Sequence, residues 1–446
     1  MRKFVIVLVA LCYSLTSCGQ ELTAQLDTLL QAYVAQNKFN GTVLVAKGGA
    51  VLLDRGYGYR NLANHGLHDK NSVFQIGSVT KQFTTAIILR LQAEKKLNVK
   101  DPISKYFPQY PKGDSITIEN LMLHTSGIYN YTNDGKFMQT EVTKPASKEK
   151  LMPLFQNKPL DFSPGTGWNY SNSAYLLLGY IIESVTKKHY EQVMRDYIFT
   201  PLKMTHSGFD FTHLQNKEKS TGYWGQNEKD SVAAPIVDSS VSFAAGAIYS
   251  TSDDLLRWHQ GLMKNIVLAS AQQEKAYTPV KNKYGYGWII DSLYGKRILS
   301  HGGGIHGFTS MFSRMPADDV CIILLSNTSS PALNDITKGI YAILYNKPYA
   351  IPQVKKEIKL PEEKLKQYLG EYTIKEGLNL IITLKDGELI ASPTNQPTSV
   401  LYAEKEDHFF VKEHDIRLKF FRNEKQEVNG FILYQGGMEV KCPKIK

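Results

Sequence analysis

The sequence predicts an α+β fold with an antiparallel sheet, followed by a small all-β module. Apolar, β-rich runs cover residues 41–47 and 50–57, and Gly48-Gly49 between them is a two-residue turn signal. This pattern indicates a β-hairpin. Short β-like runs return much later, at residues 297–300, 307–314 and 320–326. Strands at both ends of a region with helices between them are typical of an α+β domain, so we expect one antiparallel sheet to contain the hairpin and the last strands.

Three helices are expected between these strands. Residues 79–95 carry apolar side chains nearly all around the helical axis, which is typical of a buried helix. Residues 174–186 give a second apolar helix. Residues 253–263 give a third, and Ser252-Asp253-Asp254 is a good signal for its N-terminus.

The C-terminal part of the chain has a different pattern. Residues 346–363 are rich in Pro and Lys and have the composition of a linker. Short β-like runs separated by turn signals follow, at residues 380–384, 409–412, 417–421 and 431–434. They predict a small all-β module, either a sandwich or a barrel, without an obvious catalytic constellation. We therefore expect a first domain over residues 18–350 and this module over residues 351–446.

The N-terminus has the pattern of a secretory signal. Met1-Arg2-Lys3 precedes a short apolar run over residues 4–11, which is too short to span a membrane. Leu15-Thr16-Ser17-Cys18-Gly19 then resembles the lipobox of bacterial lipoproteins, in which cleavage precedes the cysteine and the thiol is lipidated. We expect a signal peptide over residues 1–17, lipidation of Cys18 and a membrane-anchored, extracytoplasmic protein. An ordinary signal peptide that contains a cysteine is the alternative.

Composition argues against several classes of protein. The chain has 446 residues, of which 42% are hydrophobic and 21% charged, as in ordinary globular domains. The net charge is +10, or +8 once Arg2 and Lys3 leave with the signal, but no Lys/Arg block has interleaved aromatic residues, so we expect no nucleic-acid partner. Cys321 and Cys442 are too few for a disulfide framework, and no His/Cys/Asp cluster has metal-ligand spacing. We therefore expect no cofactor and no metal ion.

Three short motifs carry chemistry, and each occurs three times. Ser-x-x-Lys begins at Ser78, Ser147 and Ser184. Tyr-x-Asn begins at Tyr59, Tyr131 and Tyr170, and His-x-Gly begins at His206, His259 and His301. Chance alone gives roughly one or two of each in a chain of this composition. The local context of each copy therefore has to decide among them.

Context favours Ser78 as a nucleophile. A nucleophilic serine needs a base within hydrogen-bond reach and backbone N–H groups aimed at the developing oxyanion. Ser78 follows a glycine and begins the buried helix, where the first N–H groups are unpaired. Lys81 lies one turn later on the same face, and apolar surroundings lower the pKa of a lysine. Ser184 instead ends an apolar helix before Lys187-Lys188, and Ser147 lies in a charged helix start.

The stretch Phe74-Gln75-Ile76-Gly77-Ser78-Val79-Thr80-Lys81-Gln82-Phe83 resembles the first motif of the serine β-lactamase and penicillin-binding-protein superfamily. The resemblance points to the branch of class C β-lactamases, DD-carboxypeptidases, D-aminopeptidases and related esterases. Three other stretches fit the same branch, residues 121–127, 244–251 and 284–288. The resemblance covers roughly residues 25–345, and it implies a sheet flanked by helices with an additional all-helical subdomain.

The resemblance also implies the partners of Ser78. Tyr170-Ser171-Asn172 matches the second motif of the family. There the tyrosine accepts the serine proton and donates a proton to the leaving group with help from the lysine, while the asparagine Asn172 binds substrate and steadies Lys81. Which of Lys81 and Tyr170 takes the proton first stays open. Tyr59 lies at a strand end and Tyr131 in a polar loop, so neither has the expected context.

The third motif is His301-Gly302-Gly303-Gly304, which lies between two predicted strands. The resemblance makes His301 and Gly303 substrate-binding residues, since glycines let a substrate backbone approach closely. It also implies an oxyanion hole made by the backbone N–H groups of Ser78 and Gly304. His206-Ser207-Gly208 is a rival because it includes a hydroxyl residue, but it lies in a connecting loop.

One departure from the family pattern bears on the substrate. Gly302 replaces the hydroxyl residue that helps hold a substrate carboxylate, and an absent donor costs about 1–3 kcal/mol. We therefore expect a serine hydrolase that forms an acyl-enzyme at Ser78 with a small-molecule or peptide substrate, namely a D-amino-acid peptide, amide or ester. A class C-type β-lactamase is the alternative, and a non-catalytic penicillin- or ligand-binding sensor is the alternative from another class. The C-terminal module resembles lipocalin-type barrels of similar proteins.

Overall fold

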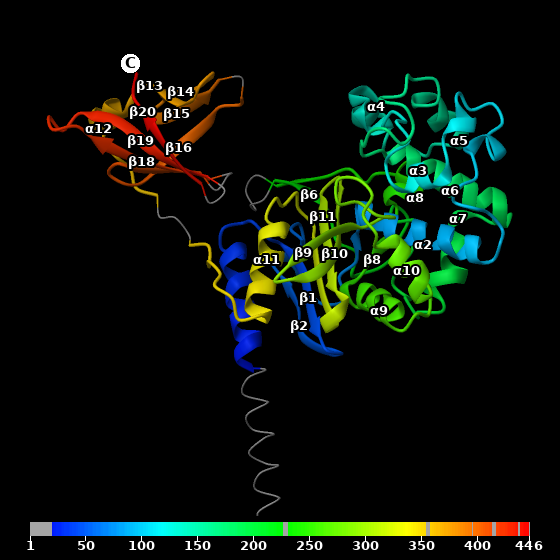
Figure 1. The fold of residues 1–446 in the computed structure, drawn as a ribbon. Helices are drawn as coiled ribbons and strands as arrows, with labels where there is room; N and C mark the ends of the chain where they lie inside the picture. The colour runs from blue at the N-terminus through cyan, green and yellow to red at the C-terminus, as the bar shows by residue number, and fades with distance from the viewer. Residues whose placement is uncertain are drawn as a thin grey trace, which may run out of the picture. The chain divides into compact units, whose positions relative to one another are not determined.

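A computed structural model gives the fold of the chain (Figure 1). It describes residues 20–225, 231–353, 357–394, 396–412, 416–435 and 438–445. The chain divides into two compact units, Met1–Pro352 and Gln353–Lys446. The predicted fold class is confirmed, because an antiparallel sheet with helices is followed by an all-β unit. The expected signal peptide over residues 1–17 and the expected lipidation site Cys18 lie outside the described residues.

A six-stranded antiparallel sheet forms the centre of the first unit, in the order β2-β1-β12-β11-β10-β9. Its strands are β1 (Gly41–Lys47), β2 (Ala50–Tyr57), β9 (Ile289–Leu293), β10 (Lys296–Ile305), β11 (Phe308–Met315) and β12 (Val320–Ser326). The predicted hairpin is confirmed, and its turn residues Gly48 and Gly49 have φ angles of 58° and 79°, as glycine allows. The prediction that the hairpin joins the last strands is also confirmed, since Val43 on β1 pairs with Leu324 on β12.

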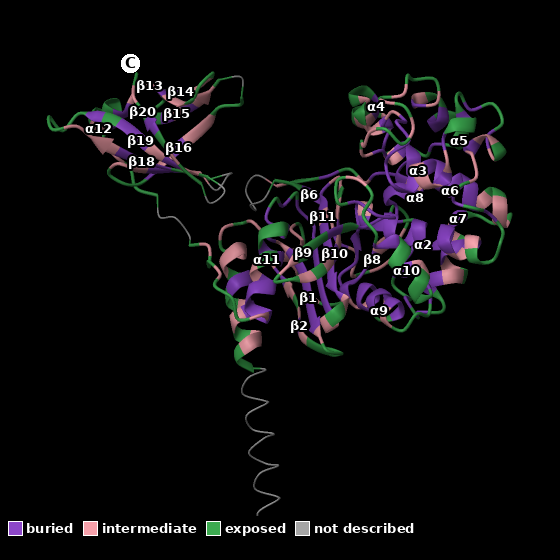
Figure 2. Cartoon of the chain, viewed as in Figure 1, coloured by how far each residue is buried: buried purple, intermediate pink, exposed green. Residues whose placement is uncertain are grey.

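The sheet is buried on both faces, and its strands feed two hydrophobic cores. Along β1, Val43 and Val45 belong to one core and Leu44 and Ala46 to the other, because successive side chains point to opposite faces. One face packs against α11 (Leu333–Leu344) and a helix over residues 20–34, neither of which the sequence analysis predicted. The opposite face packs against the helical region, and Figure 2 shows burial running through the sheet and α2.

The three predicted helices are confirmed as α2 (Thr80–Ala93), α6 (Asn172–Thr186) and α9 (Ser252–Met263). The N-terminal signal of α9 differs in detail, because Thr251 is the N-cap and accepts the Asp254 N–H at 3.2 Å. The remaining helices of this region are α3 (Ile118–Met122), α4 (Gly135–Thr140), α5 (Lys148–Leu151), α7 (Tyr190–Met194), α8 (Ser239–Gly246) and α10 (Ser270–Ala276). In Figure 1, α3 to α7 gather into a helical subdomain beside the sheet.

The second unit is an eight-stranded antiparallel sheet whose strands follow one another in chain order. They are β13 (Gly370–Lys375), β14 (Leu378–Lys385), β15 (Glu388–Pro393), β16 (Ser399–Lys405), β17 (His408–Val411), β18 (Ile416–Arg422), β19 (Val428–Gln435) and β20 (Met438–Pro443). A bridge between Tyr372 and Lys444 brings the first strand back to the last, so the sheet is a nearly closed barrel. The sequence predicted β14, β17, β18 and β19 but missed the other four strands.

The barrel has its own aromatic core. Tyr368, Tyr372, Phe420 and Phe431 are all buried, and the ring centroids of Phe420 and Phe431 lie 5.4 Å apart. In the described part of the whole chain, no helix is both long and apolar enough to span a bilayer.

Candidate active site

Ser78 lies where a tight turn runs into the buried helix. It is the middle residue of the 3-10 turn η1 (Gly77–Val79), which continues directly into α2. Gly77 has a φ of 51°, in the left-handed region that favours glycine. A Cβ on Gly77 would lie 2.8 Å from the backbone N of Gly304. Glycine at this position therefore allows the Ser78 turn to lie directly against β10.

Lys81 is fully buried one turn after Ser78. Its Nζ lies 3.1 Å from Ser78 Oγ, 2.8 Å from Asn172 Oδ1 and 2.8 Å from the carbonyl oxygen of Ala245. Burial disfavours the charged ammonium and lowers the pKa of Lys81 well below its usual range. The structure thus brings the predicted Ser78, Lys81 and Asn172 into one hydrogen-bonded group.

Tyr170 lies beside the same group. The centre of its ring lies 4.7 Å from Lys81 Nζ. Burial raises the pKa of the Tyr170 phenol, and the nearby Ser78 side chain only partly offsets this effect. The phenol is therefore protonated at neutral pH and has a proton to donate.

Asn172 is the first residue of α6 and has partners on both sides of its amide. Its Oδ1 accepts from Lys81, and its Nδ2 donates to Thr132 Oγ1 at 3.2 Å. Ser171 caps the helix by accepting the Ala174 N–H at 3.3 Å. These contacts hold the carbonyl end of the amide toward Lys81 and the nitrogen end away from it.

The glycines of β10 differ in whether the surrounding atoms leave room for a side chain. A Cβ on Gly303 would lie 2.0 Å from the carbonyl oxygen of Ile76 and 2.3 Å from Ser310 Oγ, so no side chain fits there. A Cβ on Gly302 would meet its nearest atom, Met311 Cε, at 3.6 Å, which is an ordinary contact. The absence of a hydroxyl residue at position 302 is therefore not forced by the surrounding structure.

Gly304 lies beside the nucleophile turn, with open space where a side chain would be. No atom lies within 4 Å of a Cβ built on Gly304, whereas the Gly304 backbone contacts Gly77. The backbone amides of Ser78 and Gly304, expected to form the oxyanion hole, thus belong to adjoining segments. Both residues line the same pocket.

His301 is buried and held by two hydrogen bonds. Its Nδ1 lies 2.6 Å from the carbonyl oxygen of Gly302, and its Nε2 lies 2.8 Å from the Tyr284 hydroxyl. Nδ1 therefore carries the proton, and Nε2 accepts from Tyr284. Burial, and then the nearby Lys81, lower the pKa of His301 to about 4. His301 is neutral at neutral pH and adds no positive charge to the site.

His124 is a neighbour of the site to which the sequence analysis gave no role. It is fully buried with a φ of 59°, and its Nδ1 accepts the Ser171 N–H at 3.1 Å. Its ring centroid lies 4.3 Å from that of Tyr170 and 4.8 Å from that of Tyr284. Residues 121–127, which include His124, and residues 284–288, which include Tyr284, do fit the family pattern. That resemblance did not indicate that the His124 ring would contact Tyr170 and Tyr284.

A kink in α8 supplies the third partner of Lys81. Phe243 has φ 36° and ψ −131°, which interrupts the helix. The carbonyl oxygens of the next two residues then accept side-chain donors of α2, Ala244 from Thr84 Oγ1 at 2.7 Å and Ala245 from Lys81. A strained non-glycine residue next to a reactive group is typical of functional sites. The sequence pattern gave no sign of this kink.

The rival copies of the three motifs lie elsewhere. Ser184 is exposed near the C-terminal end of α6, and Ser147 is the exposed residue before α5. His206 is exposed in a loop, where its backbone N–H donates to Asp254. Tyr131 is an exception, because it is buried and lines the Ser78 pocket, although its hydroxyl donates to the Val241 carbonyl and not to Ser78.

The pocket in front of Ser78 is small and mostly apolar. Its volume is about 100 Å³, and its lining includes Ser78, Asn172, Gly304 and residues of α4, α8 and β10. No group of His, Cys, Asp and Glu side chains within the described residues is arranged to hold a metal ion. What the described site offers is a serine, a lysine of lowered pKa, a neutral phenol and two adjoining backbone segments at the pocket, a combination suited to acyl transfer.

The fold and this arrangement are those of a serine hydrolase of the β-lactamase type, and comparison with known proteins agrees. Residues 26–347 match the model of the β-lactamase family, and residues 354–442 match a domain of unknown function, DUF3471. The chain belongs to the β-lactamase family.

The similarity to known proteins covers both units of the chain. Penicillin-binding protein 4* of Bacillus subtilis (strain 168) is 27% identical over 96% of this chain and 100% of its own length. The octameric penicillin-binding protein homologue from Pyrococcus abyssi has the same fold, with a TM-score of 0.68 and 23% identity over 94% of this chain and 99% of its own. A D-stereospecific amidohydrolase from Streptomyces sp. aligns with 73% of this chain and 99% of its own, with a TM-score of 0.63 and 25% identity.

Proposed function

We propose that this protein hydrolyses an amide or ester through an acyl-enzyme formed on Ser78. The observation that carries the proposal is the hydrogen-bond pattern of Lys81. A neutral amine has two N–H donors and one lone pair. Asn172 and Ala245 offer acceptors for the two donors, so the lone pair is left for the Ser78 hydroxyl at 3.1 Å.

Lys81 is the proton acceptor in this scheme. Its lowered pKa makes the neutral amine accessible near neutral pH, whereas the raised pKa of Tyr170 keeps the phenol protonated. Lys81 takes the proton as Ser78 Oγ attacks the carbonyl carbon, and the oxyanion is bound by the amides of Ser78 and Gly304. Tyr170 then protonates the leaving nitrogen or oxygen and regains a proton from Lys81. The C–N or C–O bond breaks, and water later releases the acid by the reverse proton path.

The names of the relatives support a D-amino-acid derivative as substrate. They include penicillin-binding proteins and a D-stereospecific amidohydrolase. Gly302 weighs against efficient β-lactam hydrolysis, because it lacks the hydroxyl that would help hold a carboxylate. We therefore rank amide or ester hydrolysis above the β-lactamase alternative. The hydrogen-bonded Ser78–Lys81 pair weighs against a non-catalytic sensor.

The proposal is tested with active-site probes. A fluorophosphonate and a labelled penicillin are added to the full chain, and any adduct is located by mass spectrometry. We expect an adduct on Ser78, together with hydrolysis of p-nitrophenyl esters that Ser78→Ala loses. Ser184→Ala is the matched control, because Ser184 has the same Ser-Val-Thr-Lys sequence at an exposed position. Labelling at Ser184, or no adduct with either probe, would refute the proposal.

We also propose that Cys18 anchors the protein to a membrane outside the cytoplasm. The lipobox-like Leu15-Thr16-Ser17-Cys18-Gly19 supports this location. Cells that express the full chain and are fed a labelled fatty acid should yield labelled protein in the membrane fraction. The Cys18→Ser variant should be unlabelled, and equal labelling of both forms would contradict the anchor.

A further inference from the structure

Among the residues that the structure describes, no charged side chain lines the pocket next to Ser78. Its lining contains polar groups of the site itself, such as Ser78, Thr132 and Asn172, beside apolar side chains. The apolar ones are Met138, Val142, Val237, Val241, Ala245 and Ile305. No Lys, Arg, Asp or Glu occurs among the lining residues that the structure describes. Val142, Val237 and Val241 are almost completely buried, so this surface is a fixed part of the core.

The carboxylates nearest in the sequence to the lining residues already have partners. Glu141, next to Val142, accepts from Lys144 Nζ at 2.9 Å and from Lys150 Nζ at 2.8 Å. Asp238 lies between the lining residues Val237 and Val241, but its Oδ1 accepts the backbone N–H of Ser240 at 2.9 Å and caps α8. Asp134 precedes Met138, and its Oδ1 accepts the Phe137 N–H at 3.0 Å and caps α4. A carboxylate that caps a helix is oriented toward the helix N–H groups, so neither is presented to a substrate ammonium.

Two other titratable groups lie at or near the pocket, His306 in its lining and Lys81 behind Ser78. Burial lowers the pKa of His306, so its imidazole is neutral at pH 7, and Lys81 Nζ is held by Ser78, Asn172 and Ala245. Neither supplies the fixed positive charge that a substrate carboxylate requires. An ionised group buried without a partner loses its hydration and gains nothing in return.

We infer that this pocket binds a short, uncharged acyl group and rejects acyl groups with an ionised ammonium or carboxylate beside the scissile carbonyl. The inference rests on the proposed function and narrows its substrate class. The pocket volume of about 100 Å³ is below the roughly 300–1,000 Å³ of pockets for drug-sized ligands, which favours acyl groups of a few carbons. N-acylated amino-acid esters and simple carboxylic esters meet this condition, whereas free D-amino-acid amides do not.

Two isosteric ester pairs test the inference with the full chain. p-Nitrophenyl isobutyrate and the p-nitrophenyl ester of D-alanine differ in a methyl group replaced by an ammonium. p-Nitrophenyl 3-methylbutanoate and the mono-p-nitrophenyl ester of malonic acid differ in an isopropyl group replaced by a carboxylate of the same shape. After subtraction of the Ser78→Ala rate at pH 6, where the α-ammonium is largely ionised because its pKa is about 7.7, we expect kcat/KM to be at least tenfold higher for the uncharged member of each pair. Equal or better turnover of either charged ester would overturn the inference.

A variant with an added charge makes the test directional. Met138 is half-buried in the lining, so Met138→Glu places a carboxylate at the pocket without disturbing the deep core. We expect the preference for isobutyrate over the D-alanine ester to fall at least tenfold in Met138→Glu and to stay within threefold in Met138→Gln, the uncharged control of equal size. An unchanged preference in Met138→Glu would place the acyl group elsewhere and overturn the inference.

The two hypotheses fail in different ways. If the fluorophosphonate labels Ser78 but charged esters are preferred, the acyl-group inference is wrong and the serine hydrolase stands. If Ser78 is not labelled and no ester is hydrolysed, the proposed function is wrong and the acyl-group inference falls with it.

Discussion

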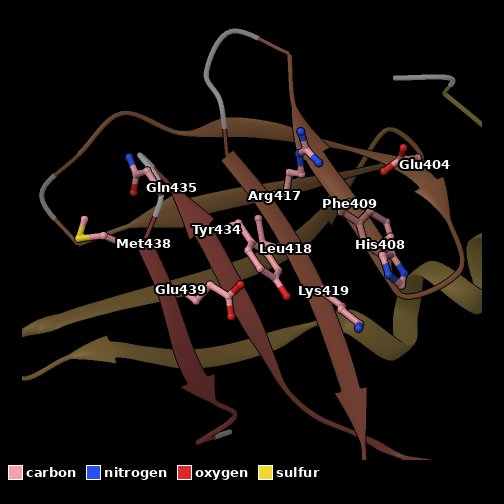
Figure 3. A pocket seen from close by; sticks show the side chains of 10 residues that line it. All are labelled: Glu404, His408, Phe409, Arg417, Leu418, Lys419, Tyr434, Gln435, Met438 and Glu439. Atoms are coloured by element: carbon pink, nitrogen blue, oxygen red, sulfur yellow. The ribbon is translucent and has the colours of Figure 1, made fainter. Parts of the chain in front are cut away.

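The pocket at Ser78 and the groove on the C-terminal barrel place their lysines in opposite physical settings. The groove has a volume of about 450 Å³ and is lined by strands β17 to β20 and the end of β16 (Figure 3). Its polar lining residues are Glu404, His408, Arg417, Lys419, Tyr434, Gln435 and Glu439. Within the described part of the barrel, neither Arg417 nor Lys419 forms an ion pair or hydrogen bond through its side chain, and both are exposed. Lys81 by contrast is fully buried and has three partners.

The difference explains why we assign the proposed reaction to the smaller pocket. A solvated lysine keeps its proton at neutral pH and changes position freely, so it cannot serve as a base held at a fixed distance. Burial of Lys81 lowers its pKa, and the fixed acceptors on α6 and α8 direct its lone pair to Ser78. Cavity size is therefore a poor guide to chemistry in this molecule, whereas the burial of hydrogen-bonded titratable groups is a good one.

The largest contrast between the two regions is expected from the same substitution made in each. Lys81→Met should lower kcat/KM for an ester substrate by roughly 10³-fold or more, because general-base catalysis contributes about 10²–10⁴-fold and a buried network is broken as well. Lys419→Met should change kcat/KM less than twofold and the free energy of unfolding by no more than about 0.5 kcal/mol. If Lys81→Met and Lys419→Met lowered kcat/KM equally, the assignment of Lys81 as the base would be wrong. Steady-state kinetics and thermal unfolding of both variants provide the measurement.

The glycines of β10 give a second matched pair, inside the active site. Gly303→Ala should lower kcat/KM by about 10²-fold, since its Cβ would collide with the Ile76 carbonyl oxygen and displace the strand from the Ser78 turn. It should also lower Tm by several degrees. Gly302→Ala has room for its Cβ, so its kcat/KM and Tm should stay close to those of the wild type. A Gly302→Ala variant as damaged as Gly303→Ala would contradict this account of the strand.

The pH dependence of activity sharpens the contrast between buried and solvated lysines. Lys81 must lose its proton to act as a base, so kcat/KM should rise tenfold per pH unit below the pKa of Lys81 and level off above it. Because burial lowers this pKa, the midpoint should lie well below 10.5, the ordinary value for lysine. The pKa of His301 is lowered to about 4, so His301 should give no inflection near 6.5. A midpoint at the ordinary lysine value would contradict the assigned role.

The smallest effect is expected from removal of single hydroxyls. Tyr284→Phe removes the 2.8 Å hydrogen bond to His301 and should lower kcat/KM about two- to tenfold, as for the loss of one neutral hydrogen bond. Tyr434→Phe in the barrel groove is the matched control and should leave kcat/KM unchanged. If Tyr284→Phe is also neutral, the hydrogen bond to His301 does not position the site.

Local sequence patterns predicted a large part of the fold. The Gly48-Gly49 turn and the apolar runs on either side of it gave the hairpin, because turn chemistry and side-chain alternation are local properties. The helix over residues 20–34 and α11 were missed. Half of the barrel strands were missed too, since short strands with mixed polarity depend on their neighbours for pairing and burial.

In the candidate site, too, some residues were predicted from the sequence and others were missed. Family motifs in chain order singled out Ser78, Lys81, Tyr170, Asn172 and His301. They did not reveal His124, which contacts the site through the Ser171 N–H and two aromatic rings. Nor did they reveal the Phe243 kink that frees the Ala245 carbonyl. Such contacts join residues that are distant in sequence, so no short motif can encode them.

The sequence by itself determined the fold class, the family and the order of the motifs around Ser78. The tertiary structure decided which groups Lys81 touches, that Gly303 must lack a side chain while Gly302 need not, and that the pocket lining carries no charged side chain among the described residues. The reason is physical. Residue type and local pattern fix what chemistry a side chain is able to do, whereas burial and distance, which arise when separate segments pack together, fix its pKa and its partner.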